Sequence, residues 1–447
     1  MKVKLQKLWD TLNSSYWFVP TIMAILAVAL AFGMLTLDRS GKAGPIENLG
    51  WVYTGGPEGA RGLLSAVVGS MISVTATAFS ISIVALQLAS SNFGPRLMRT
   101  FMQDRGNQIV LGTFISTFVY CLLVLRSVRG QDYDIFVPQI SVTVGMVLAL
   151  FSIGVLIYFI NHASTIIQAS HVIKEVTTDL DQAIDRLFPE QLGQSTSPSK
   201  HHVGEIPASF EWESQTICCN DNGYLQVIDE DKLMRLACKN DLLLRVKPRP
   251  GQFVIHGSDL VKAFPGERVE EKIAEQIKNT FILGKERTEQ QDIEFPITEL
   301  VEIALRALSP GINDPFTAIR CIDRLSAGLS RLAQKDFPSP YRYDEEENLR
   351  VITNPVTFTE LTDAAFNQIR RYGQSDVAVT ICLLDAIARI APYTRNKKDK
   401  ATLLRHAQMI ERGGQQEAGE EYDNVCIEER YKAVVEALEL ESPKDWD

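Results

Sequence analysis

The feature that most constrains the fold is an uncharged apolar segment, Leu63–Ala89, that carries a regular line of polar residues. It is long enough to cross a bilayer as a helix. Polar side chains recur three, four or seven residues apart, which places them in one line along a helix: Ser70, Ser73, Thr77, Ser80, Gln87 and Ser91. Because polar groups that face lipid tails lack hydrogen-bond partners, we expect this line to face another helix or water.

Three further apolar segments are long enough to span a membrane, which predicts an α-helical integral membrane protein with four transmembrane helices. The four segments are Tyr16–Leu37, Leu63–Ala89, Ile109–Leu125 and Phe136–Ile160. Tyr16 and Trp17 fit the aromatic belt of a membrane interface. The rest of the chain has an ordinary soluble composition. We therefore expect a four-helix transmembrane domain over residues 1–162, followed by a cytosolic α+β region.

The loop between the second and third spans is basic. Arg96, Arg99 and Arg105 lie there among apolar side chains, a pattern typical of an amphipathic segment that lies flat on the membrane surface. An element that gates a pore is the alternative. Lysines and arginines near the ends of the spans favour, by a modest margin, a topology with the N- and C-termini in the cytoplasm.

The fourth span is expected to continue past the membrane as a helical extension over residues 163–190, because no proline occurs between Pro138 and Pro189. Apolar residues there repeat every three and four positions as a heptad seam: Ile166, Ala169, Ile173, Val176, Leu180, Ala183 and Leu187. The seam either packs against the chain's own soluble domain, the commoner arrangement, or joins copies of the chain. His162 and His171 are interpreted as polar interface residues, with a pH-sensing role as the alternative.

The soluble region divides into a linker, a β-rich part and a helical part. Residues 191–205 are polar and read as the linker, while residues 206–268 hold short apolar runs broken by turn signals. The spacing of Gly223, Gly251 and Gly257 resembles that of lipoyl and biotinyl carrier domains, which favours a small barrel or sandwich. No carrier lysine is apparent in a hairpin tip, so a carrier role does not follow.

Residues 269–447 are predicted to form a helical domain. Thr357 and Glu360 make a capping-box pattern ahead of a helix that Gly373 can close. Further helices are expected over Asp376–Ile390, Asp399–Glu411 and Glu421–Leu440, with Arg412–Glu420 as a flexible joint.

The densest soluble motif, ALSPGINDPFTA, spans Ala307–Ala318 and joins two predicted helices. Asp314 can cap the second helix ahead of Pro315, and Gly311 allows an unusual backbone angle. A rigid helix–turn–helix corner accounts for these residue types. The alternative is a ligand site in which Ser309, Asn313 and Asp314 present oxygen atoms to an ion or a small molecule.

The sequence lacks the usual enzyme signatures. It contains no phosphate-binding GxxxxGK[ST] loop, no HExxH and no GxSxG elbow. Its seven cysteines show no metal-site spacing, and its net charge of -10 argues against nucleic acid as a partner. We therefore expect no catalytic activity, no catalytic or metal-ligating residues and no cofactor.

Two long blocks resemble one bacterial family of predicted membrane proteins. They are FSISIVALQLASSNFGPRLMRTFMQDRGNQIVLGTFISTFVYCLLVLR and EFPITELVEIALRALSPGINDPFTAIRCID. The family is known as domain of unknown function twenty-two fifty-four, and the likeness covers nearly the whole chain. It implies a bacterial inner (cytoplasmic) membrane location, and it supplies no activity or site residue.

The hypothesis that we favour is a homo-oligomeric channel or pore, lined by Ser70, Ser73, Thr77, Ser80, Gln87 and Ser91 and gated by the cytosolic domain. Arg96, Arg99 and Arg105 would form its inner mouth, and its partners would be the lipid bilayer, other copies of itself and small ions. The main alternative is a membrane-anchored sensor or scaffold in which the line is a helix–helix interface. A secondary transporter and a membrane enzyme are weaker alternatives, since the spans show no central charge and no activated nucleophile.

Overall fold

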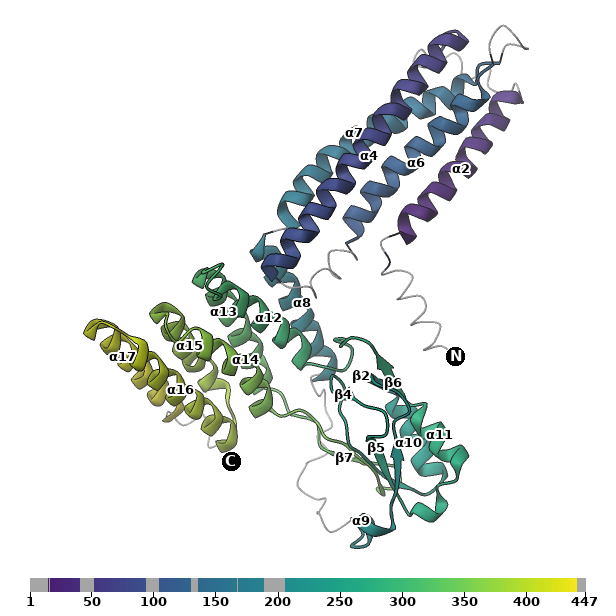
Figure 1. The fold of residues 1–447 in the computed structure, drawn as a ribbon. Coiled ribbons are helices and arrows are strands. Elements are labelled where there is room, and N and C mark those ends of the chain that lie inside the picture. Colours follow the sequence, from purple (N-terminus) through teal and green to yellow (C-terminus); the bar gives the residue numbers. More distant parts are fainter. Residues whose placement is uncertain are drawn as a thin grey trace. The chain divides into compact units, whose positions relative to one another are not determined.

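The computed structural model describes residues 15, 17–40, 52–93, 104–129, 136–166, 168–188 and 206–439, without the side chains of residues 89–93 and 166. The chain divides into two compact units, Met1–Val172 and Ile173–Asp447 (Figure 1). Each unit has its own hydrophobic core.

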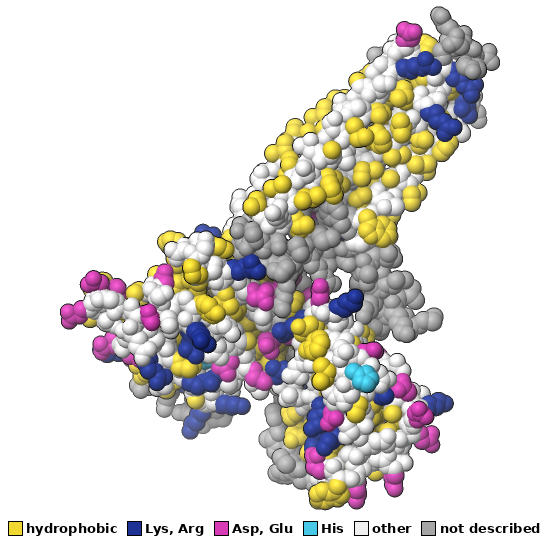
Figure 2. Space-filling view, viewed as in Figure 1, with side chains coloured by type: hydrophobic (Ala, Val, Ile, Leu, Met, Phe, Trp, Pro, Cys, Tyr) yellow, Lys and Arg dark blue, Asp and Glu magenta, His cyan; other side chains and the backbone are white. Residues whose placement is uncertain are grey.

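The first unit contains the four expected membrane helices. They are α2 (Phe18–Arg39), α4 (Pro57–Phe93), α6 (Arg105–Ser127) and α7 (Gln139–Ile166). All four are long and apolar enough to cross a membrane, which confirms the predicted spans. In Figure 2 this unit shows a broad band of hydrophobic side chains, with lysine and arginine side chains gathered at one end, as expected for a surface that contacts lipid tails and headgroups.

Helix α6 is the centre of this unit. Over its most apolar stretch 56% of the residues are buried, against 17% in α4, so α4 lies at the periphery. Phe114, Tyr120 and Val124 of α6 are fully buried among the other helices. The packing is completed by polar contacts, since the Thr117 and Ser152 hydroxyls lie 3.0 Å apart and Asp38 accepts hydrogen bonds from the first backbone N–H groups of α7.

The fourth span does not continue as one helix. It ends at Ile166, and a second helix, α8, covers Ala169–Leu187. The Gln168 backbone N–H donates to Thr165 at 3.1 Å, a tighter turn than that of an α-helix. The Ser164 and Thr165 hydroxyls donate to carbonyls four residues back, a pattern that bends helices. The expected continuous rod over residues 163–190 is therefore interrupted.

The heptad seam of α8 packs inside the second unit. Ile173, Val176, Leu180 and Ala183 are buried, and a Cβ at Gly328 of α13 (Pro315–Ala333) would lie 2.7 Å from Leu180. Arg331 of α13 bonds to both Asp181 and Asp185. Of the two arrangements considered for the seam, the structure thus has packing against the chain's own soluble domain.

Two open sheets form the β-rich part. The larger has the strand order β1-β5-β3-β8-β7 and the smaller has the order β4-β2-β6. The strands are β1 (Gln215–Cys218), β2 (Gly223–Ile228), β3 (Leu243–Val246), β4 (Phe253–Val254), β5 (Asp259–Phe264), β6 (Phe281–Gly284), β7 (Tyr341–Tyr343) and β8 (Leu349–Ile352). The first five lie in predicted β runs, but the sheets are open rather than a barrel. Strands β6, β7 and β8 come from beyond residue 268, where only helices were expected.

Short helices accompany the sheets and complete their core. They are α9 (Phe210–Glu213), α10 (Glu230–Lys239), η2 (Gly266–Arg268) and α11 (Glu271–Lys278). The prediction of β structure was wrong for α10, in which Asp229 caps the helix and Leu233 and Ala237 are buried. Leu225, Leu244 and Val261 from three strands fill the same core.

The remaining helices pack together as the helical part. They are α12 (Glu294–Ala307), α13, α14 (Phe358–Tyr372), α15 (Val377–Ile390), η3 (Ala391–Tyr393), α16 (Lys397–Glu417) and α17 (Glu421–Glu439). The capping box of Thr357 and Glu360 is confirmed, and Gly373 ends α14. The flexible joint predicted over Arg412–Glu420 was wrong, because α16 remains helical to Glu417 where it packs against α15 and α17.

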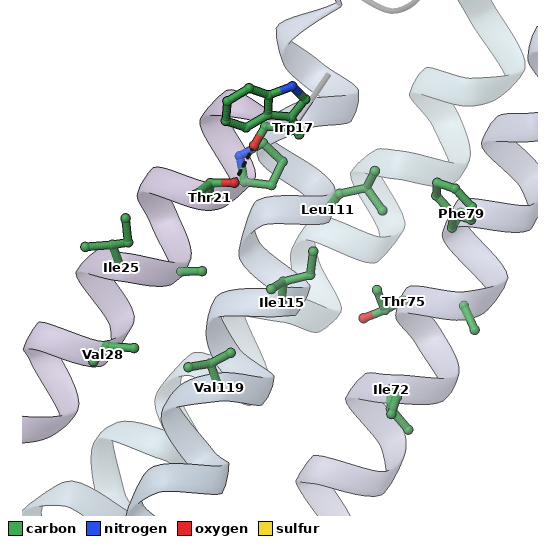
Figure 3. Close-up of a pocket in the computed structure, with 13 residues that line it drawn as sticks. Trp17, Thr21, Ile25, Val28, Ile72, Thr75, Phe79, Leu111, Ile115 and Val119 are labelled. Carbon is green, nitrogen blue, oxygen red and sulfur yellow. Dashed lines mark hydrogen bonds between the residues drawn. The ribbon is translucent and has the colours of Figure 1, made fainter. Parts of the chain in front are cut away.

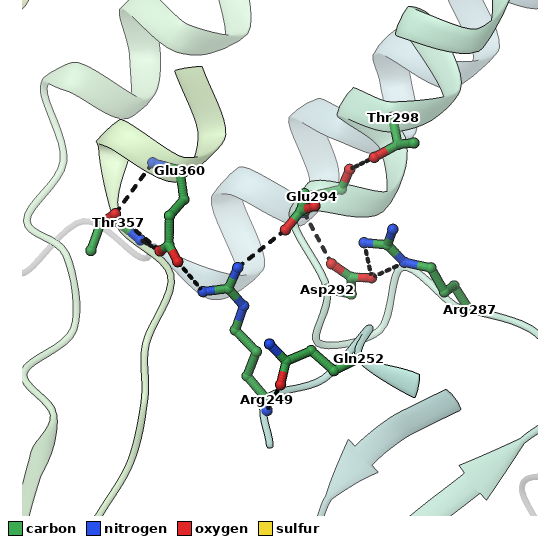
Figure 4. Close-up of polar contacts among 8 residues, drawn as sticks. All are labelled: Arg249, Gln252, Arg287, Asp292, Glu294, Thr298, Thr357 and Glu360. Atoms are coloured by element: carbon green, nitrogen blue, oxygen red, sulfur yellow. Dashed lines mark hydrogen bonds and ion pairs between the residues drawn. The ribbon is translucent and has the colours of Figure 1, made fainter. Parts of the chain in front are cut away.

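Arg249 joins the β-rich and helical parts (Figure 4). Its guanidinium lies 2.8 Å from Glu360 at the start of α14 and 3.3 Å from Glu294 at the start of α12. Beside it Asp292 is buried and pairs with Arg287 at 2.7 Å. Gly251 has a φ of +89°, and a Cβ there would lie 2.1 Å from Asp292, so only glycine fits this turn.

Replacing Leu180 by alanine should lower the free energy of unfolding of the second unit by about 2–5 kcal/mol, because Leu180 is 1% exposed. Thr178→Ala, an exposed change on the same helix, is the matched control. Thermal unfolding of the full chain in detergent measures both. A change in oligomer size without a change in stability would instead indicate that the seam joins copies.

Asp179 of α8 should make stability depend on pH. Burial, with Glu289 and Glu175 nearby, raises the pKa of its carboxyl from 3.8 to about 6. Because the pKa is raised in the folded state, the contribution of Asp179 to stability is most favourable below about pH 4 and is lost as the pH rises through about 6. Asp179→Asn should therefore raise the Tm at pH 7.5 by about 2 °C and have little effect at pH 4. An equal rise at both pH values would contradict this account.

Candidate functional site

Helix α4 has two opposite faces, and the polar line lies on the outer one. The inner face packs into the helix's own bundle through Ala60, Leu64, Met71, Ala78, Ser82 and Ala85, all of them buried. Ser73, Ser80 and Gln87 each follow one of these residues by two positions, which is about 200° around a helix. Accordingly the first five residues of the polar line are all exposed: Ser70, Ser73, Thr77, Ser80 and Gln87.

Small residues make up much of the outer face of α4. Gly62, Ala66, Gly69 and Ala76 are exposed beside the polar residues, and a Cβ at Gly62 or Gly69 would contact nothing within 4 Å. Bulky side chains flank this stripe, with Ile72 and Phe79 on one side and Ile81 and Leu88 on the other, all of them exposed. The face thus combines a polar centre with apolar borders.

Most of the hydroxyls in the polar line donate within their own helix. Ser70 donates to Ala66 O at 2.7 Å, Ser73 to Gly69 O at 3.2 Å and Thr77 to Ser73 O at 2.9 Å. Contact with lipid is therefore less costly for these groups than the sequence suggests. Gln87 differs, because an amide carries two N–H donors and an acceptor that its own helix cannot satisfy together. Gln87 is the strongest indication that the outer face has a polar neighbour.

Three residues of the predicted pore and its mouth are described only in part or lie outside the described residues. Ser91 is in the last turn of α4, without a described side chain, and Arg96 and Arg99 lie outside the described residues. Arg105 is the first residue of α6 and is exposed. The structure therefore brings five of the six predicted lining residues onto one face.

An apolar groove of about 710 Å³ lies on the flank of α4 that bears Ile72 and Phe79 (Figure 3). It lies between α2 and α4, and α6 forms its floor through Leu111, Ile115 and Val119. Ile72 and Phe79 separate it from the polar line. Because hydrocarbon surrounds almost all of it, this groove suits lipid tails and does not suit ions.

A partly buried polar cluster at one end of the bundle was not predicted. Asp104 caps α6, accepting from the Gly106 and Asn107 backbone N–H groups, and lies 2.6 Å from His162 Nε2 of α7. Tyr158 stacks on His162 with ring centroids 5.3 Å apart. Asn107 is 1% exposed and its side-chain amide has no hydrogen-bond partner among the described residues. The sequence signal was an Asp ahead of a span, which is a helix-cap pattern.

In the corner between α12 and α13, each predicted ligand residue has a structural role. Asp314 caps α13 by accepting from the Thr317 backbone N–H and hydroxyl, as the sequence predicted. The Ser309 hydroxyl donates to Arg306 O at 2.6 Å. Asn313 has a φ of +51°, so the left-handed residue is Asn313 rather than Gly311. Among the described residues, no group of three or more His, Cys, Asp or Glu side chains could hold a metal ion.

Comparison with known proteins gives one matching family model and several similar proteins. A family model described as "Predicted membrane protein (DUF2254)" matches residues 13–389. An uncharacterized protein of Mycobacterium bovis and one of Mycobacterium tuberculosis are each 31% identical to the chain over 428 residues, which is 94% of this chain and 80% of each relative. No solved structure matches the chain significantly.

Gly106→Ala should destabilise the membrane unit by about 1–3 kcal/mol, because the added methyl would lie 2.6 Å from His162 Nε2. Removing the imidazole should relieve the clash, so Gly106→Ala combined with His162→Ala should cost less than the sum of the two single changes. Thermal unfolding in detergent gives the three values. If the destabilisation of the double variant equals the sum of the two single values, the His162–Asp104 pair does not depend on Gly106.

Proposed function

We propose that this chain, which belongs to the DUF2254 family of predicted membrane proteins, forms a homo-oligomeric channel in which α4 helices from several copies surround a common axis. The observation that carries the proposal is the outward direction of the polar line. The polar line from Ser70 to Gln87 is not covered by the chain's own bundle, because the opposite face of α4 packs there. Around a shared axis, Gln87 and the hydroxyls would face water.

The extent of the polar line supports water over a dry interface. From Ser70 to Gln87 it covers about 26 Å along the helix, close to the roughly 30 Å of the hydrocarbon layer. Hydroxyl and amide oxygens replace part of an ion's hydration shell without trapping the ion. Because the line has no charged residue, the channel would select weakly along its length.

The mouths and the gate follow from the chain's basic residues and its connections. With both termini in the cytoplasm of a bacterial cell, Arg96, Arg99 and Arg105 lie at the inner mouth and favour anions. Helix α8 follows the fourth span and packs on α13, so a movement of the cytosolic unit would be transmitted to the spans through α8.

The alternative is a membrane-anchored sensor or scaffold, and the small residues of the stripe favour it. Gly62, Ala66 and Gly69 allow two α4 helices to approach closely, as in dimers built on small residues. Because Ser70, Ser73 and Thr77 already donate hydrogen bonds within α4, removing their hydroxyls from water in a dry contact costs less free energy. In that case the cytosolic unit would carry the function by binding a ligand or a protein.

Leucine at Thr77 or Ser80 tests the proposal, because it would fill the axis with hydrocarbon. Each variant should reduce ion flux into liposomes at least about tenfold while the assembled size is unchanged. Ile81→Leu, an exposed change on the flank of the stripe, is the matched control and should leave the flux unchanged. If both variants conduct as well as the wild-type protein, a pore along this face is excluded. If the wild-type protein itself conducts no ions and the variants change the assembled size, the scaffold is supported.

A further inference from the structure

The proposed channel assigns no role to the apolar groove beside α4 (Figure 3). Helices α2 and α4 form its walls, on which Ile25 is 63% and Phe79 48% exposed. Helix α6 forms its floor, where the Ile115 side chain lies between the two walls. Such a groove does not stay empty in a hydrocarbon layer, because its lining would lose van der Waals contacts on one side. A molecule other than the bundle itself is needed to fill it.

The groove arises where α2 stays against α6 while the other three helices build the core beside it. A Cβ at Gly112 of α6 would lie 3.3 Å from the Cα of Pro20, so α2 and α6 are in close contact at this level. The core cluster that contains Leu111, the preceding residue, is built from α4, α6 and α7. Further along, Ala31 of α2 and Leu64 of α4 belong to one buried cluster, which closes the groove at that end.

The length of the groove matches one leaflet of a bilayer. Along α2 the lining runs from Trp17 to Val28, which is about 17 Å at the helical rise, against roughly 30 Å for the whole hydrocarbon layer. Trp17 is exposed at the start of the span, where aromatic rings lie at the membrane interface. The groove therefore begins at the interface and ends near the middle of the bilayer. An acyl chain has this extent, whereas a membrane helix from a second copy would cross both leaflets.

The lining favours hydrocarbon over a polar ligand. Of the 13 residues that line the groove in Figure 3, only Trp17, Thr21 and Thr75 carry a polar side-chain group. The Thr21 hydroxyl donates to Trp17 O at 2.8 Å and the Thr75 hydroxyl to Met71 O at 2.6 Å, so neither needs a partner from a ligand. Because the walls are membrane spans, the groove is continuous with the surface that the spans present to lipid.

We propose that the groove between α2, α4 and α6 is a lipid-binding site that holds one acyl chain of a phospholipid from the leaflet on the Trp17 side. The headgroup would lie at the level of the Trp17 ring. Since the surrounding bilayer is equally apolar, affinity comes from van der Waals contact with three helices at once. The chain would support the flank of α4 that bears Ile72 and Phe79 and leave the polar line free. This inference rests on the membrane unit alone, so it holds whether or not α4 lines a channel.

Native mass spectrometry of the full chain tests the proposal by counting the phospholipids that remain bound after extraction in a mild detergent. We expect about one retained phospholipid per wild-type chain. Ala24→Trp places an indole ring in the groove and should reduce the retained lipid at least about fivefold. Ala29→Trp is the matched control, because Ala29 is exposed on the same helix and is not among the residues that line the groove. It should retain as much lipid as the wild-type protein.

Thermal unfolding of the delipidated protein gives a second readout that does not depend on any variant. Added dioleoylphosphatidylglycerol should raise the Tm of the wild-type chain and of Ala29→Trp by at least about 2 °C, because a ligand that binds the folded state stabilises it. Ala24→Trp should show no such rise.

Three outcomes would overturn the proposal. The first is a wild-type chain that retains no phospholipid and gains no stability from added lipid. The second is equal lipid retention by Ala24→Trp and Ala29→Trp. The third is a lower subunit number in Ala24→Trp with unchanged lipid, which would assign the groove to a second copy of the chain.

Discussion

Polar groups inside a bilayer need partners, and the membrane unit meets this requirement almost entirely within one chain. Asp38 caps α7, Asp104 caps α6, and the Thr117 and Ser152 hydroxyls bond to each other. There are exceptions: the buried amide of Asn107 has no partner among the described residues, and the outer face of α4 is turned away from the bundle. Its hydroxyls are partly satisfied along their own helix, whereas Gln87 requires a neighbour that the bundle does not supply. The need for a further partner, water or another copy, follows from this one face.

The second unit is attached to the membrane unit through a helix that belongs to its own core. Leu180 and Ala183 of α8 are buried, and Arg331 holds α8 by two carboxylates. Helix α8 begins at Ala169, three residues after the fourth span ends at Ile166.

Local patterns in the sequence were sufficient for the spans and the helix caps. Apolar length predicted four membrane helices, and the spacing of Thr357 and Glu360, and of Asp314 and Pro315, predicted two caps that the structure confirms. Features that depend on distant partners were missed. Strand β8 pairs in parallel with β3 across about a hundred residues, and helix α16 passes through Gly413 and Gly414 because two neighbouring helices support it.

The candidate site shows the same division. Periodicity placed the polar residues of α4 on one line, but only the positions of α6 and α7 show that the line faces away from the bundle. The Asp104–His162 pair joins residues on different helices, so a local pattern gave its cap and not its partner. Arg249, which links the sheets to two helix starts, could not be predicted because its partners lie 45 and 111 residues away.

The central claim is that α4 faces an axis shared by several copies, and the number of subunits tests it most directly. Native mass spectrometry of the protein extracted in lipid nanodiscs gives that number without a label or a substitution. The account predicts three or more copies in one assembly, enough for α4 helices to enclose water. A monomer would contradict the claim outright, and a dimer would replace the pore with a dry α4–α4 interface.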